Sequence, residues 1–96
     1  MEMNKIHVNI SSYKTINEYA VDDDDVASDY CYFKTLEITF DNDMSVYVKI
    51  PMGVDEGTQL DYLKKELKND LRLANYEISF NWSIKQLNKF FKYLNE

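Results

Sequence analysis

The sequence predicts one small α+β domain, and three observations support this prediction. The chain has 96 residues, which suits a single hydrophobic core. Segments with an apolar residue at every second position are mixed with segments whose apolar residues recur at helical spacing. Two glycines and one proline leave little room for flexible linkers. We therefore expect a single domain over residues 1–96 with a small antiparallel or mixed sheet of about four strands, a central β-hairpin at 31–50 and two packed helices.

The N-terminal segment has the pattern of a half-buried strand, because Ile6, Val8 and Ile10 alternate with polar residues. The stretch 11–21 that follows fits two structures. Its first serines can cap a short helix near 13–20, and the same residues also fit a strand. We favour the short third helix.

The hairpin at 31–50 is the clearest element. Apolar residues alternate with polar ones along 30–40 and again along 45–50. Between these two segments, 41–43 reads Asp-Asn-Asp, and both residue types tolerate a positive φ in a turn. Pro51 and Gly53 end the second strand.

Two helices are predicted in the C-terminal half, at 59–73 and at 84–94. The first has Thr58 as its N-cap and a stripe of leucines at helical spacing: Leu60, Leu63, Leu67 and Leu71. The second begins with a capping box formed by Ser83 and Gln86, and its buried side is marked by Ile84, Leu87, Phe91 and Leu94.

A short strand separates the two helices, because Tyr76, Ile78 and Phe80 alternate with polar residues. The resulting element order is compatible with a split βαβ arrangement. It fits equally well an antiparallel sheet with helices on one face.

The cysteine content indicates an intracellular protein. Cys31 is the single cysteine, so the chain has no internal disulfide, whereas a secreted domain of this size usually needs one or more. The N-terminus does not have the pattern of a signal peptide, and no apolar stretch approaches the ~20 residues that span a bilayer. We expect a cytoplasmic location, in the host cytoplasm if the protein is phage-encoded, and no membrane partner.

The residue types present argue against built-in chemistry. An EF-hand loop that starts at Asp22 would need Gly at its sixth position and Glu at its twelfth, where this chain has Ala27 and Phe33. One histidine, His7, and one cysteine are too few for a zinc site within one chain. We interpret Cys31 as a small core residue and His7 as a surface residue. We therefore expect no enzyme activity, no cofactor and no metal.

Direct nucleic-acid binding is not expected either. Basic residues share one face of each predicted helix. They are Lys64, Lys68 and Arg72 in the first helix and Lys85, Lys89 and Lys92 in the second. A formal net charge of −6 opposes general affinity for phosphates, so we interpret both faces as solvated.

Charge is strongly separated along the chain. Residues 15–61 contain twelve acidic residues and only two lysines, which gives a net charge of −10, whereas 62–96 has a net charge of +3. Most of these acids fall in predicted loops. If the loops converge at one end of the sheet, they form a negative surface that speeds association with a basic partner.

The candidate partner-binding residues are the acids of these loops and two tyrosines that serve as aromatic anchors among the charges. They are Asp22, Asp23, Asp24, Asp25, Asp29, Tyr30, Tyr32, Asp41, Asp43, Asp55 and Glu56.

These features favour an inhibitor that occupies a basic, nucleic-acid-binding surface of a larger protein or complex. In general character (short, acidic, cysteine-poor, α+β, with residue usage typical of AT-rich genomes) the chain resembles phage-encoded anti-CRISPR and anti-restriction proteins. These proteins share no common motif, so the resemblance transfers no functional residue. Two alternatives stay open: an immunity protein or antitoxin that neutralises a basic toxin nuclease, and a non-inhibitory accessory or oligomerisation subunit, for example a homodimer.

Overall fold

The computed structural model describes residues 4–22 and 30–96. This part of the chain forms five strands in two small sheets, together with two helices, which confirms the predicted α+β class. The elements, in chain order, are β1 (Asn4–Val8), β2 (Ile10–Asp22), β3 (Tyr30–Phe40), β4 (Ser45–Pro51), α1 (Glu56–Asp70), β5 (Tyr76–Phe80) and α2 (Ile84–Leu94). None of the helices described is long and apolar enough to cross a membrane.

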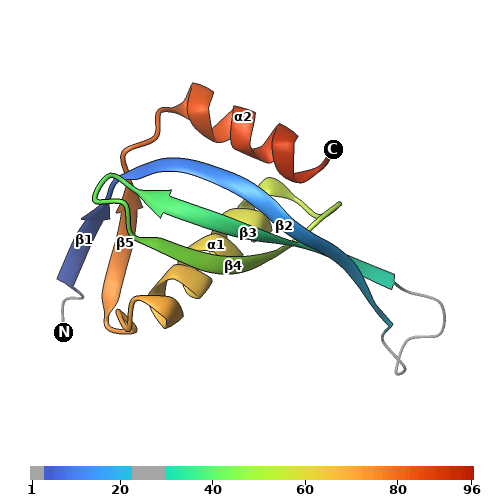
Figure 1. Ribbon diagram of the computed structural model, residues 1–96, viewed down its shortest axis with the longest axis horizontal. Helices are drawn as coiled ribbons and strands as arrows, with labels where there is room; N and C mark the ends of the chain where they lie inside the picture. The colour runs from blue at the N-terminus through green and yellow to red at the C-terminus, as the bar shows by residue number, and fades with distance from the viewer. Residues whose placement is uncertain (1–3, 23–29) are drawn as a thin grey trace.

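The two sheets have different topologies. Strands β2, β3 and β4 form an antiparallel sheet in that order, and β1 pairs in parallel with β5. The β1–β5 pair lies at one end of the molecule, and the β2–β3 hairpin projects beyond the helices at the other end (Figure 1). The long axis of the molecule therefore runs along the hairpin.

The preference for a helix near 13–20 is wrong, because these residues belong to β2 and pair with β3. Shifts in register occur between Ile10 and Ser12 and between Thr15 and Asn17. Each irregularity displaces the side chains that follow it, so apolar residues do not recur at a clean period of two. Pairing with β3 then decides the structure of a segment whose local pattern is ambiguous.

The second helix agrees with the prediction more closely than the first. Helix α2 spans the predicted residues, and its Ser83–Gln86 capping box is present. Helix α1 begins at Glu56 and ends at Asp70 instead of covering 59–73, and its N-cap is Asp55 instead of Thr58. Ile84, predicted to be buried, is 78% exposed because the first turn of α2 extends past the core.

The core lies between the inner face of the three-stranded sheet and the two helices. Strands β3 and β4 present their alternating apolar residues to it, as predicted, and α1 contributes Leu63 and Leu67. Helix α2 adds Phe90, which is fully buried and contacts the rings of Tyr13 and Trp82 at 5.0 Å each. Burial among these rings, and then the neighbouring Tyr93, raise the pKa of the Tyr13 hydroxyl.

Helix α2 is fixed to β2 at the second irregularity of that strand. The backbone N–H of Thr15 donates to the Tyr93 hydroxyl over 2.7 Å, and the Thr15 and Tyr93 hydroxyls lie 2.6 Å apart. The shift in register between Thr15 and Asn17 thus leaves an N–H that the tyrosine satisfies.

We expect Tyr93→Phe to lower the free energy of unfolding by about 1–2 kcal/mol, because it leaves a partly buried N–H without its acceptor. Denaturant unfolding measures this loss. The control is Tyr47→Phe, since Tyr47 is 58% exposed and its hydroxyl should contribute less than about 0.5 kcal/mol. Equal stability of the two variants would contradict this role of Tyr93.

Helix α1 ends in a Schellman motif that has an unusual residue at its left-handed position. The N–H of Leu73 donates to the carbonyl of Lys68 over 2.7 Å, and the N–H of Arg72 donates to the carbonyl of Asn69. Arg72 has a φ of 56°, in the region that favours glycine.

Arg72→Gly should therefore raise the free energy of unfolding by about 0.5–1 kcal/mol, since relief of the left-handed conformation outweighs the extra freedom of glycine in the unfolded chain. Thermal unfolding provides the measurement. Arg72→Ala removes the same side chain without this relief and should show no such gain. An equal gain in both variants would assign the effect to the arginine side chain.

Candidate functional site

The projecting hairpin contains one group of the predicted binding residues. Its last described pair joins Asp22 to Tyr30, two pairs beyond the one between Ala20 and Tyr32. The backbones of Asp22 and Tyr30 therefore mark the far end of the hairpin. The Tyr32 side chain is 57% exposed. The predicted residues Asp23, Asp24, Asp25 and Asp29 lie outside the described part of the chain.

A second acidic group follows the base of the same hairpin. Pro51, at the end of β4, pairs with Phe33, and the N–H of Met52 donates to the carbonyl of Tyr32 over 2.7 Å. Helix α1 begins a few residues later, so Asp55 and Glu56 lie at this end of the sheet.

Asp41 and Asp43 lie at the opposite end. Strand β3 runs from the far end of the hairpin to the turn at 41–44, and successive turns of an antiparallel sheet fall at opposite ends. An 11-residue strand places them roughly 35 Å apart. The expected convergence of all acidic loops is therefore wrong for Asp41 and Asp43. Asp43 has a φ of 67°, as the predicted turn requires.

Asp55 has a structural role of its own. It is the N-cap of α1, where its carboxylate accepts hydrogen bonds from the N–H of Thr58 over 3.0 Å and from the Thr58 hydroxyl over 2.7 Å. These bonds hold the pKa of Asp55 below its usual value, the side-chain bond having the larger effect.

This lowered pKa predicts acid sensitivity at one helix end. Asp55 stabilises the folded chain fully above its unfolded pKa of about 3.9, and this contribution is lost as pH falls through its lower folded pKa. Asp55→Asn keeps an acceptor for Thr58 but does not titrate. Melting temperatures between pH 6 and pH 2.5 should fall further in the wild type than in Asp55→Asn. Parallel curves would contradict the prediction.

The hairpin has a small pocket lined by residues of both its faces, which we call the hairpin notch. It has a volume of about 270 Å³ and is lined by Glu18, Tyr19, Ala20, Tyr32, Phe33 and Met52. Register pairs Glu18 with Lys34 and Ala20 with Tyr32, so these four side chains share one face of the sheet. That face is covered by helices as far as Lys34 and is open at Tyr32.

The opposite face of the hairpin is fixed to α1 by aromatic contacts. The Tyr19 and Phe33 rings stack at 5.6 Å, and Phe33 meets the edge of Tyr62 of α1 at 6.4 Å. These contacts hold the base of the hairpin against the body of the protein.

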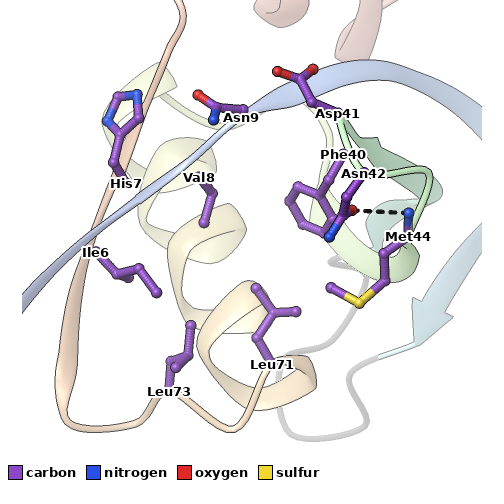
Figure 2. Close-up of a pocket in the computed structure, with 10 residues that line it drawn as sticks. All are labelled: Ile6, His7, Val8, Asn9, Phe40, Asp41, Asn42, Met44, Leu71 and Leu73. Atoms are coloured by element: carbon purple, nitrogen blue, oxygen red, sulfur yellow. Dashed lines mark hydrogen bonds between the residues drawn. The ribbon is translucent and has the colours of Figure 1, made fainter.

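A larger pocket of about 410 Å³ lies at the other end, between β1, the turn at 41–44 and the end of α1 (Figure 2). The side chains of Ile6, Val8, Leu71 and Leu73 converge on it. Two hydrogen bonds fix its polar edge: the Asn42 side-chain oxygen accepts from the N–H of Met44, and the N–H of Asp41 donates to the Asn9 carbonyl. The pocket has an apolar floor and a polar edge.

The histidine and the cysteine are not neighbours. His7 is exposed in β1, as predicted, and its Nδ1 lies 3.2 Å from the Ser79 hydroxyl. The backbone of Cys31 pairs with Val21 near the far end of the hairpin, in the other sheet. Among the described residues, no group of three or more histidine, cysteine, aspartate or glutamate side chains is placed to hold a metal ion.

Sequence reasoning missed Glu18, Met52 and Lys34, all of which shape the notch or its base. The missing signal was the second strand. Once 10–22 is assigned to a strand, the aspartate run becomes the connection of a hairpin, and the residues flanking it become cross-strand neighbours.

In comparisons with protein-family models, with curated proteins and with solved structures, none matches this chain.

Proposed function

We propose that the protein is a small inhibitor that presents the β2–β3 hairpin to a basic, nucleic-acid-binding surface of a larger protein. The observation that carries this proposal is the position of the hairpin, which projects beyond the helices (Figure 1). In the sequence, the aspartate-rich segment 22–29 lies between its two strands. A projecting hairpin can enter a groove that a compact body of the same charge cannot.

The charges of α1 support the same orientation. Its first turn, with Asp55 and Glu56, lies at the base of the hairpin, whereas Lys64, Lys65 and Lys68 lie in its second half, toward the β1–β5 end. A helix of 15 residues is roughly 22 Å long, more than two Debye lengths at physiological salt. The β1–β5 end also contains Asp41, Asp43 and Glu77, so its charge is mixed, whereas acidic residues predominate near the hairpin.

The physical model is competition for phosphate sites. Carboxylates of the hairpin occupy cationic positions that the partner uses for the nucleic-acid backbone, and Tyr32 adds exposed aromatic area beside them. The proposal includes no enzyme activity and no direct nucleic-acid contact. An immunity protein or antitoxin would use the same surface against a toxin nuclease, and the identity of the captured partner separates the two.

Charge reversal at the hairpin tests the proposal. A partner is first captured from host lysate and identified, and its association rate is then measured with the wild type and with Asp23→Lys/Asp24→Lys. We expect the double variant to associate at least about tenfold more slowly at low salt, and the difference to shrink at ~0.5 M salt, where screening is strong.

The matched control is Asp41→Lys/Glu77→Lys, which changes the net charge by the same amount at exposed positions of the opposite end. It should change the rate much less. Equal slowing by both variants would reject a local role for the hairpin, and a rate that neither variant changes would reject the electrostatic model.

A further inference from the structure

We infer that the hairpin notch is a receptor for one arginine side chain of the partner. This inference rests on the proposed function, because it names the group of the basic surface that the hairpin recognises. It follows from the size, the exposed ring and the charge of the notch.

The size of the notch suits a single side chain. Its volume of about 270 Å³ lies below the ~300–1,000 Å³ typical of small-molecule pockets. Ala20 lies directly opposite Tyr32 in the strand register, so only a methyl group stands beside the tyrosine ring. Met52, Tyr19 and Phe33 supply the other apolar lining of the notch, and the small Ala20 leaves room for a flat group beside Tyr32.

The charge of the notch favours a cation. The Glu18 side chain is 56% exposed, and the oxygen that contacts Lys34 at 3.4 Å is only one of its two. A carboxylate has about four acceptor positions, so Glu18 can accept further donors. Lys34 offsets part of the Glu18 charge, so an incoming guanidinium is held mainly by hydrogen bonds to the exposed Glu18 carboxylate and by the Tyr32 ring.

The Tyr93 carbonyl in the last turn of α2 is already bonded to Lys34 and does not line the notch. A basic side chain that enters the notch meets the Glu18 carboxylate and the Tyr32 ring.

Arginine fits this combination better than lysine. Its planar guanidinium can stack on the Tyr32 ring and donate to the Glu18 carboxylate at the same time, because its N–H groups lie in the plane of the stacked group. Lysine offers a compact charge that is more strongly hydrated and does not stack in this way.

The probe is a blocked Gly-Arg-Gly peptide, titrated into the full ¹⁵N-labelled chain. We expect saturable shifts of the backbone amides of 18–20 and 32–33. The same peptide with citrulline, a neutral isostere, should cause no saturable shift, and the lysine peptide should bind more weakly. Tyr32→Ala should weaken arginine binding by about two- to fivefold, the usual effect of an exposed cation–π contact.

Tyr47→Ala is the control, since Tyr47 is 58% exposed, like Tyr32 at 57%, but lies in β4 outside the notch. It should bind the peptide as the wild type does. Ala20→Leu is a second test that keeps the tyrosine ring: it fills the space beside Tyr32 and should also weaken binding. Equal shifts with citrulline, or wild-type affinity in Tyr32→Ala or in Ala20→Leu, would overturn the inference.

The peptide titration and the association rate of the complex report separate failures. Loss of the notch as an arginine receptor appears in the titration, whereas failure of the proposed docking appears in an association rate that Asp23→Lys/Asp24→Lys does not change.

Discussion

The structure depends on how it compensates one buried charge. Lys34 is 3% exposed, and its ammonium donates to the Tyr93 carbonyl over 2.9 Å, faces Glu18 at 3.4 Å and lies 5.0 Å from the centre of the Tyr93 ring. An ammonium buried without partners costs several kcal/mol, so β2 and the last turn of α2 must be in place together. Gln59 and Asn95 hold the same end of the core together. Their side chains hydrogen-bond to each other, Gln59 donates to the Pro51 carbonyl, and Asn95 accepts from the N–H of Gly53. Beyond Lys34 the helices end and the hairpin continues uncovered.

The sequence predicts the fold well wherever one periodicity dominates. The alternation in β3, β4 and β5 and the leucine stripe of α1 each identify an element, because each has one face against a single core. Prediction fails in β2 because two irregularities interrupt its alternation, and both are satisfied by groups far along the chain, such as Tyr93. It fails at Ile84 because a helical stripe does not show where the core ends. The boundary of α1 is misplaced since Asp55 and Thr58 are both suitable caps, and only the path from Pro51 selects between them.

The candidate site follows from the sequence only in part, and topology explains the remainder. Composition identifies the acidic residues but contains no information about which loops share an end of the sheet. The assignment of 10–22 to a strand decides that question: it makes β3 the central strand and sends the turn at 41–44 to the end opposite the aspartate run. If 13–20 had been a helix, the aspartate run at 22–29 could have lain near the turn at 41–44 or near the turn after Pro51. A single error in secondary structure therefore changes the predicted shape of the negative surface while the number of charges stays the same.

In the proposed function, the hairpin combines two kinds of contact that act at different stages of binding. Carboxylates of the segment 22–29 would act over a Debye length and affect the rate at which a basic partner arrives. The notch at Tyr32 and Glu18 would act only at contact and so affect the rate at which the partner leaves. Charge alone would attract any basic surface and would therefore also favour non-specific binding. The hairpin notch lies a few residues from the carboxylates of segment 22–29. It would therefore select a partner that has an arginine at a fixed distance from its cationic patch. The projecting hairpin can make both kinds of contact because the core ends at Lys34 and leaves its inner face open.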